Sequence, residues 1–144
     1  MNIICQELQV PYAAEDIYRL VEDIHAYPEF LPWCKHANIL RKIDNVVEAR
    51  LTLTKSGITK NFATRNLMTP ATKIEMHLLE GPFKHLYGVW EFFNEPEGCR
   101  VTLRMEFSFD SKILAMMLEP IFKSISESLL DAFVKRAEAK CNKI

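Results

Sequence analysis

The sequence predicts an α+β fold in which a curved antiparallel sheet of six or seven strands wraps around a long C-terminal helix. Between residues 48 and 109, short segments alternate apolar and polar residues and are separated by tight turns. After Ser111 the spacing of apolar residues becomes helical and stays so for about 27 residues. The chain has 144 residues, of which 49% are hydrophobic and 26% charged. This length and balance predict a single globular domain over residues 1–144.

The N-terminal part predicts a strand, a helix and a stiff apolar turn. Residues 3–10 alternate and end at Pro11, and residues 13–25 carry apolar side chains at helical spacing. Tyr27-Pro28 is expected to close that helix. The turn that follows is bracketed by two prolines and carries three large apolar residues: Phe30, Leu31 and Trp33.

Alternation in the middle of the chain predicts the sheet. The segments that alternate are 48–54, 58–68, 74–78, 85–93 and 101–109. The last is the clearest, with five apolar residues on one parity from Val101 to Phe109. Successive strands joined by tight turns indicate an antiparallel sheet with one buried face. Only the final helix is long enough to cover that face.

The C-terminal helix is expected to begin at Ser111, a suitable N-cap. Its apolar stripe runs from Leu114 to Phe133, and Pro120 is expected to kink or split it because proline cannot donate to the preceding turn. Met116 and Met117 lie just before that point and are adaptable side chains.

An internal cavity is suggested by three residues on the inward parity of the predicted strands. Thr64, Asn66 and Gly88 fit a cavity wall better than a dry core, because burying an unpaired polar group is costly. The alternative is that they lie near strand ends and contact water. The pattern alone leaves both interpretations open.

Several segments resemble the family of coenzyme Q-binding proteins and bacterial ribosome-association toxins. They are Val10-Pro11-Tyr12, Tyr27-Pro28-Glu29-Phe30-Leu31-Pro32-Trp33-Cys34, Gly81-Pro82-Phe83-Lys84 and Asp131-Ala132-Phe133-Val134-Lys135-Arg136-Ala137. The stretch from Lys55 to Asn66 is most similar to the bacterial toxin branch. The resemblance covers nearly the whole chain and implies the helix-grip fold of the START/Bet v 1-like superfamily. Ala13 departs from the family pattern, which has a capping residue such as Ser at this position, so the first helix is expected to begin without a side-chain cap.

The resemblance implies two kinds of binding. One is ubiquinone or another isoprenoid or lipid in the cavity, without a required cofactor. The other is the large ribosomal subunit, whose association with the small subunit would be blocked, with an antitoxin protein as a further partner. Two alternatives stay open: a dedicated quinone or lipid chaperone for respiration without a ribosomal role, and a polyketide cyclase-like enzyme. The last is known in the family by fold analogy alone.

The cavity is expected to be lined from the two-proline turn, the inward strand positions and the C-terminal helix. The candidates are Phe30, Leu31, Trp33, Phe62, Thr64, Asn66, Met76, Trp90, Leu103, Met105, Phe107, Met117, Leu118, Phe122 and Ile125. The apolar turn could instead be a plug that packs on the sheet, and most of the helix stripe could be ordinary core. Residues near Pro120, such as Phe122, are the candidates for a gate.

A basic block is the feature best suited to a ribosome contact. Residues 35–73 hold eight Lys or Arg against two acids, although the whole chain has a net charge of −1. The candidates that lie near expected loops and turns are Arg41, Lys42, Lys55 and Lys60. An ordinary solvated face explains the charge equally well.

Other classes of site find little support. The four histidines are scattered, no Cys/His set has zinc spacing, and no nucleophile or nucleotide-binding motif occurs. We therefore expect no metal site, no catalytic residue and a protein that is not an enzyme. No secretory signal and no apolar run of roughly 18 residues is visible, and the cysteines form no CxxC pair, so the expected location is cytoplasmic.

Overall fold

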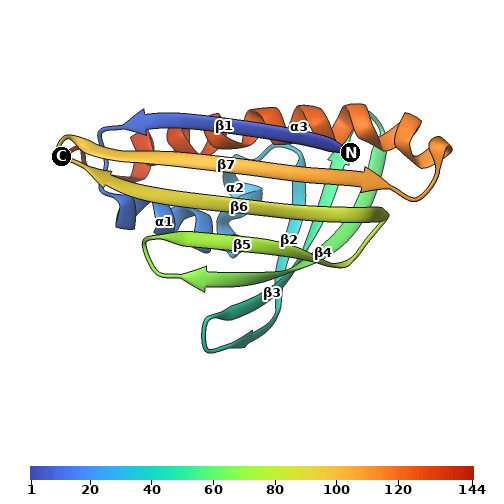
Figure 1. Ribbon diagram of the computed structural model, residues 1–144, viewed down its shortest axis with the longest axis horizontal. Helices are drawn as coiled ribbons and strands as arrows, with labels where there is room; N and C mark the ends of the chain where they lie inside the picture. The colour runs from blue at the N-terminus through green and yellow to red at the C-terminus, as the bar shows by residue number, and fades with distance from the viewer.

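The computed structural model describes the whole chain, Met1–Ile144, as seven strands and four helical segments (Figure 1). In chain order the elements are β1 (Asn2–Val10), α1 (Ala14–Glu22), the 3-10 helix η1 (Ile24–Ala26), α2 (Tyr27–Phe30), β2 (Cys34–Ile43), β3 (Val46–Lys55), β4 (Ile58–Thr69), β5 (Lys73–Glu80), β6 (Phe83–Glu95), β7 (Gly98–Phe109) and α3 (Lys112–Lys140). The predicted α+β helix-grip architecture is confirmed.

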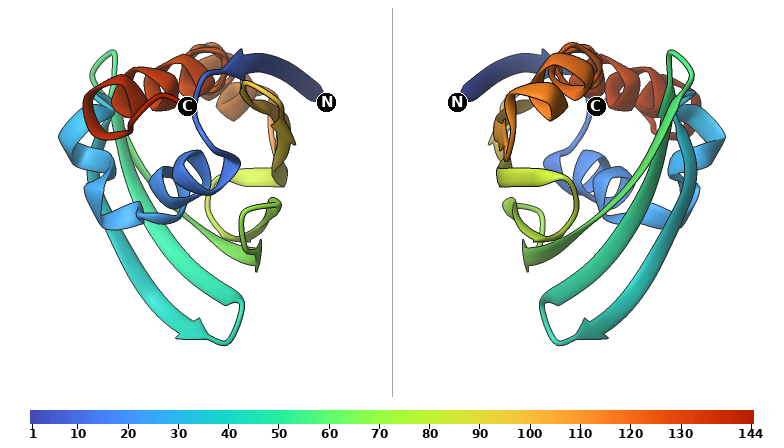
Figure 2. Two further views of the ribbon diagram at one scale, coloured as in Figure 1. Left: turned by 90° about the vertical axis from the view of Figure 1, so that its left-hand side faces the viewer. Right: turned by 90° about the vertical axis from the view of Figure 1, so that its right-hand side faces the viewer.

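One antiparallel sheet contains all seven strands in the order β1-β7-β6-β5-β4-β3-β2. Figure 2 shows that the sheet curves around the interior and that α3 lies across its open side. The short helices α1 and α2 lie on the same concave side, beneath the C-terminal half of α3 (Figure 1). The sheet and α3 therefore enclose the interior, and the N-terminal half of α3 lies away from the other helices.

The alternation in sequence places apolar side chains on the concave face, as predicted. In β7 the five residues at alternate positions from Val101 to Phe109 are all buried, and the residues between them are half-buried or exposed. In β6, Leu86, Gly88 and Trp90 are buried in the same way. A side-chain period of two on a curved sheet thus makes one apolar face and one solvated face.

The strand β2 was not predicted, because residues 34–43 lack regular alternation; Arg41 and Lys42, expected near a loop or turn, lie in this strand just before the turn to β3. Only Cys34 and Ala37 of this edge strand are fully buried. Its pairing with β3 is interrupted by two register shifts, between Cys34 and His36 and between Ile39 and Arg41. An edge strand with bulges loses the regular alternation by which a strand is predicted.

The helix predicted over 13–25 is also shorter than expected, since α1 ends at Glu22 and a 3-10 turn follows. The two-proline segment begins with a single helical turn, α2, in which Pro28 occupies one of the first helical positions. Proline is compatible with that position because the amide there needs no partner inside the helix.

The first helix begins at Ala13 without a side-chain cap, as predicted. One of its N-terminal amides finds its acceptor in another element, because the amide of Ala14 donates to Oδ1 of Asn94 in β6 at 3.3 Å. The missing cap is thus replaced by a tertiary hydrogen bond that the local sequence does not reveal.

The long helix α3 begins as predicted and does not split. The amide of Leu114 donates to Oγ of Ser111 at 3.1 Å, so Ser111 is the N-cap. The helix continues through Pro120 for 29 residues. Proline leaves the carbonyl of Met116 without its usual helical donor. Met116 is 79% exposed, so water can take that place.

Candidate functional site

A cavity of about 70 Å³ lies between the concave face of the sheet and α3. Its wall is mostly aliphatic and aromatic, and both tryptophans of the chain contribute to it. The lining residues are Ile24, Tyr27, Trp33, Ala49, Leu51, Leu53, Phe62, Thr64, Asn66, Met76, Leu86, Gly88, Trp90, Met105, Phe122, Ile125, Ser126, Leu129 and Phe133.

The structure brings most of the predicted lining residues together around this cavity. Those in its wall are Trp33, Phe62, Thr64, Asn66, Met76, Trp90, Met105, Phe122 and Ile125. Leu118 lies in the wall of a second, smaller pocket that adjoins the first. These positions come from four strands, the helix α3 and the turn before β2, so residues that are far apart along the chain meet at one cavity.

Five predicted residues do not line the cavity. Leu31, Leu103 and Phe107 are at most 1% exposed and pack inside the core. Phe30 stacks edge-on against Phe133 at 5.1 Å between ring centroids and faces an outer groove instead. Met117 is 46% exposed on the first part of α3. Inward parity alone does not separate a cavity wall from the packed core behind it.

Several lining residues were not among the sequence candidates: Leu86, Leu129 and Phe133 belong to patterns already described for β6 and α3, and three further groups have other origins. Ala49, Leu51 and Leu53 alternate in β3 but were read only as a strand pattern. Ile24 and Tyr27 belong to the connection after α1, whose path a local pattern does not reveal. Ser126 lies one helical turn after Phe122 on the same face of the helix, but it is polar, so a stripe defined by apolar residues leaves it out.

The cavity contains a small set of neutral polar groups. Oγ1 of Thr64 donates to Oδ1 of Asn66 at 2.7 Å, and both side chains are buried. Oγ of Ser126 is buried without any hydrogen-bond partner. Because its carbonyl accepts from Thr64, the side-chain amide of Asn66 keeps its N–H groups for another acceptor. The hydroxyl of Tyr27 is already committed, since it donates to the carbonyl of Val21.

The cavity is small in this closed conformation. An engineered cavity of about 150 Å³ accepts benzene, and ligand pockets usually measure about 300–1,000 Å³. A ligand larger than a few waters must therefore displace side chains from the wall. The best placed are Met76 and Met105, whose flexible tips fill the space in front of Gly88: a Cβ there would lie 2.5 Å from Cε of Met76 and 2.8 Å from Sδ of Met105.

A second pocket of about 30 Å³ continues from the first toward the surface. The two pockets share Leu53, Phe62 and Phe122 as walls. The remaining residues of the second pocket are Lys55, Ile58, Lys60, Pro82, Phe83, Phe109, Leu118 and Ile121. Together the pockets form an apolar path that ends between the β3–β4 hairpin, the β5–β6 connection and the N-terminal half of α3.

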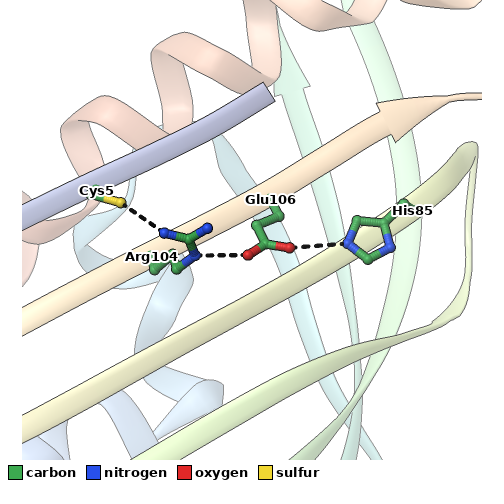
Figure 3. A network of polar contacts seen from close by, with 4 residues as sticks. All are labelled: Cys5, His85, Arg104 and Glu106. Atoms are coloured by element: carbon green, nitrogen blue, oxygen red, sulfur yellow. Dashed lines mark hydrogen bonds and ion pairs between the residues drawn. The ribbon is translucent and has the colours of Figure 1, made fainter. Parts of the chain in front are cut away.

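The clearest cluster of ionisable groups lies on the opposite face of the sheet. Arg104 donates to Glu106 at 2.7 Å, His85 lies 3.4 Å from Glu106, and Cys5 lies 3.5 Å from Arg104 (Figure 3). The hydrogen bond from Arg104, with a smaller contribution from His85, lowers the pKa of the Glu106 carboxyl. These residues lie on β1, β6 and β7 and point away from the cavity, whose wall contains no carboxylate, imidazole or ammonium group.

The four basic candidates do not form one patch. Arg41 lies opposite Glu48 near the start of β3, while Lys55 ends that strand. Glu48 and Lys55 are seven residues apart along the extended strand, so Arg41 and Lys55 are separated by roughly 23 Å along the strand direction. None of the four candidates forms an ion pair, whereas Arg50, Arg65 and Lys73 of the same basic block are each paired with a glutamate.

Comparison with known proteins agrees with this architecture. Residues 10–134 match the model of the family described as "Polyketide cyclase / dehydrase and lipid transport". The "Ribosome association toxin RatA" of Escherichia coli K12 is 38% identical over 139 residues, covering 96% of this chain and 88% of the relative. The chain belongs to the RatA/COQ10 family of START-like proteins.

More distant members and structures extend the comparison. The mitochondrial "Coenzyme Q-binding protein COQ10 homolog B" of Xenopus laevis is 24% identical, covering 88% of this chain and 54% of that protein. A START superfamily protein from Mycobacterium smegmatis has a TM-score of 0.80 at 20% identity, covering 95% and 97% of the two chains. The Zhui aromatase/cyclase from Streptomyces sp. R1128 has a TM-score of 0.85 at 20% identity, covering 95% and 93%. At this identity the two structures establish the fold alone.

No helix of this RatA/COQ10 family member is long and apolar enough to cross a membrane.

Proposed function

We propose that this protein binds a neutral apolar molecule with carbonyl acceptors in its cavity, and that ubiquinone or a related isoprenoid quinone is that ligand. The observation that carries the proposal is the pairing of an apolar, aromatic wall with a buried hydroxyl, Oγ of Ser126, that has no hydrogen-bond partner in the protein. The side-chain amide of Asn66, whose carbonyl oxygen accepts from Thr64, is a second donor in the wall. The name of the Xenopus relative, a coenzyme Q-binding protein, supports the same ligand.

The chemistry of a quinone matches this wall. A quinone ring carries carbonyl acceptors and no donor, and its isoprenoid tail is wholly apolar. A buried hydroxyl without a partner costs about 1–3 kcal/mol, so a ligand carbonyl that accepts from Ser126 recovers stability that the empty protein lacks. The aromatic side chains of Trp33, Trp90 and Phe133 supply flat apolar surface for the ring.

Binding on this proposal requires the cavity to open. The tips of Met76 and Met105 move away from Gly88, and the tail leaves along the apolar path past Phe122. Thioether side chains adapt to irregular shapes at low cost. Burial of apolar ligand surface supplies the driving force at roughly 25 cal/mol per Å².

The proposed role is binding without catalysis. The ionisable groups that acid–base chemistry would use lie on the convex face, and the cavity offers only neutral hydroxyl and amide groups. A cyclase of the aromatase type is the alternative, and turnover of a polyketide substrate by the purified protein would establish it.

The test is isothermal titration with a short-chain ubiquinone for the wild type, Ser126→Ala and the matched control Ser124→Ala. Ser124 is exposed on the same helix. Loss of one hydrogen bond should weaken binding about 2- to 12-fold for Ser126→Ala, with no change for the control. Wild-type protein that shows no saturable heat, or binding equal in all three proteins, would contradict the proposal.

A second candidate function is association with the large ribosomal subunit; a relative at 38% identity is named "Ribosome association toxin". The observation that favours it is an exposed pair of cations without ion-pair partners, Arg41 and Lys42 on the edge strand β2. Clustered Lys and Arg that contact phosphate give binding that weakens steeply with salt. In this role the protein acts in the cytoplasm, with an antitoxin protein as a regulating partner. Four free cysteines accord with a reducing compartment.

Cosedimentation with purified large subunits tests this second function. The variant Arg41→Glu/Lys42→Glu should lose binding and its salt dependence. The control Lys35→Glu changes an exposed charge at the far end of the same strand and should bind as the wild type does. If the double variant cosediments as well as the wild type, β2 is not the ribosomal contact.

A further inference from the structure

Two lysines stand at the surface end of the apolar path. Lys55 ends β3 and Lys60 lies near the start of β4, and both contribute to the wall of the second pocket. In the β3–β4 ladder Lys60 is directly opposite Leu53, and Lys55 is opposite Ile58. Opposed residues of an antiparallel pair share a face, so both lysines point to the concave side of the sheet.

This placement is unusual for charged residues. The sheet cations that do form ion pairs, such as Arg50 and Arg65, point to the convex face and contact glutamates there. Lys55 and Lys60 form no ion pair and no hydrogen bond, and they are diagonal neighbours on one face, about 7–8 Å apart at their backbones by ladder geometry. Their ammonium groups repel each other, and an anion placed between them is attracted to both.

The immediate surroundings of the two lysines are apolar. Ile58, Phe83 and Ile121 line the pocket beside them. Lys84 and Lys112 are exposed and have no ion-pair partners; they follow Phe83 and Phe109 of the pocket wall by one and three residues but do not line the pocket. The nearby acids Glu80, Asp110 and Glu119 do not line it either, and Glu80 is paired with Arg50. The site thus combines two ammonium groups with a dry interior.

We propose that this mouth binds the anionic head of a single-chain amphiphile, such as a fatty acid, whose chain extends along the apolar path into the cavity. The carboxylate lies between the ammonium groups of Lys55 and Lys60, and the chain passes Phe62 and Phe122. This ligand class goes beyond the quinone proposed above, because a neutral quinone has no anionic group that could pair with the two lysines. It shares the chamber but uses neither Ser126 nor Asn66, so the two proposals fail independently.

The path to the cavity is consistent with a flexible chain. Phe62 and Phe122 belong to both pockets and meet edge-on at 6.0 Å between ring centroids, so a small rotation of either ring connects the pockets. Ile113, Met116 and Met117 are exposed on the adjoining turns of α3 and can fold over a bound chain.

The experiment compares decanoate with 1-decanol, which have the same chain but a charged and a neutral head. Binding is measured by titration calorimetry on the full chain for the wild type, for Lys55→Gln/Lys60→Gln and for the control Lys84→Gln/Lys112→Gln. The control removes equal charge from the same end without touching the pocket wall. Circular dichroism verifies that all three proteins are folded.

The expected result is that neutralising the two lysines weakens decanoate binding but not 1-decanol binding. Decanoate affinity should fall by about tenfold or more in Lys55→Gln/Lys60→Gln and decrease with added salt. 1-Decanol affinity should stay within about twofold. The control should retain decanoate binding. Acetate, which has the head without the chain, should bind no more than weakly.

Four results would overturn the proposal. The first two are equal decanoate affinity in wild type and Lys55→Gln/Lys60→Gln, and an equal loss of decanoate affinity in the control variant. The third is acetate binding as tight as decanoate binding. The fourth is wild-type protein that does not bind monomeric decanoate but sediments with phosphatidylglycerol vesicles through the same two lysines. The last result would identify a lipid surface as the partner. The lysine variants should bind quinone as the wild type does, since Ser126 is unchanged, so the two proposals are tested separately.

Discussion

The concave and convex faces of the sheet are built from the same strands but from opposite chemistry. On the concave side, aromatic rings pack against each other and against α3, and Phe107 meets Phe122 at 4.7 Å between centroids. On the convex side, polar pairs link neighbouring strands: Arg65 with Glu48 at 2.9 Å, and Arg100 with Glu7 at 2.9 Å. Stability should therefore reside on one face and solubility on the other.

The difference also shows where the molecule departs from its own pattern. Ser126 is a buried hydroxyl without a partner, and Lys55 and Lys60 are cations that point to the apolar side. Such departures are expected at functional sites, where local stability is given up for binding. The predictions below compare matched positions on the two faces, beginning with the largest expected effect.

Truncation of one concave side chain should cost far more than truncation of its convex neighbour. Phe107 is fully buried, whereas Ser108 beside it in β7 points to the other face and forms no side-chain hydrogen bond. Phe107→Ala should lower the free energy of unfolding by about 3–5 kcal/mol, and Ser108→Ala should change it by less than about 0.5 kcal/mol. Urea denaturation measures both. Similar losses for the two variants would contradict a core confined to the concave side.

The cysteines of the two faces should differ strongly in reactivity. Cys99 is 1% exposed on the concave side of β7, and burial raises the pKa of its thiol to about 11. Roughly one Cys99 thiol in a thousand is then ionised at pH 8, and the thiolate is the reactive form. Cys5 is exposed beside Arg104 on the convex face.

A thiol-reactive disulfide reagent at pH 8 should therefore modify Cys5 rapidly and Cys99 only after unfolding. Peptide mapping by mass spectrometry identifies the modified residue, and Cys5→Ser is the control that removes the fast phase. Fast labelling of Cys99 in the folded protein would show that the interior opens more readily than the packed concave face allows.

Removal of the unpaired hydroxyl should stabilise the empty protein. Ser126→Ala eliminates a buried polar group without a partner, and we expect a gain of about 1 kcal/mol over Ser124→Ala, which accounts for helix propensity. The same substitution should weaken quinone binding. Thermal unfolding of the two variants measures the difference. A loss of stability specific to Ser126→Ala would mean that this hydroxyl has a partner in the protein.

Neutralising the convex network should have the smallest effect. Arg104 and His85 lower the pKa of Glu106, so the carboxylate is favoured in the folded state. Its contribution is therefore present above the ordinary carboxyl pKa and is lost as the pH falls through the lower folded value. Glu106→Gln should cost less than about 1 kcal/mol at pH 7, because the pair is near the surface.

The check for Glu106 is a stability measurement at pH 7 and at pH 3 for wild type and variant. The difference between the proteins should shrink at the acidic pH. If the difference in free energy of unfolding between the two proteins grows on acidification, the Glu106 carboxylate does not stabilise the folded state as proposed.

The sequence predicted the parts of the fold that depend on local periodicity. Alternation from Val101 to Phe109 places β7, and Ser111 places the start of α3. The strand β2 was missed because an edge strand with two register shifts lacks regular alternation. The hydrogen bond from Ala14 to Asn94 that replaces the cap also had no local signal, because these two residues are 80 positions apart.

The candidate site was only partly predictable for a related reason. Parity shows which residues point inward, and this places Thr64, Asn66 and Trp90 in the cavity wall. Parity does not show how far a side chain lies from the empty space, so Leu103 and Phe107 were assigned to the wall when they pack in the core. Ser126 is polar within an apolar stripe, and only the structure shows that its hydroxyl has no partner.

The most direct test of the proposed cavity is the intrinsic fluorescence of the protein during titration with a short-chain ubiquinone. Trp33 and Trp90 are the only tryptophans, and both line the cavity, so a quinone bound there lies close enough to quench them. Quenching should saturate at one quinone per chain and should weaken in Ser126→Ala but not in Ser124→Ala. Emission that stays unchanged, or that falls linearly without saturation as it does for a quencher free in solution, would contradict quinone binding inside the fold.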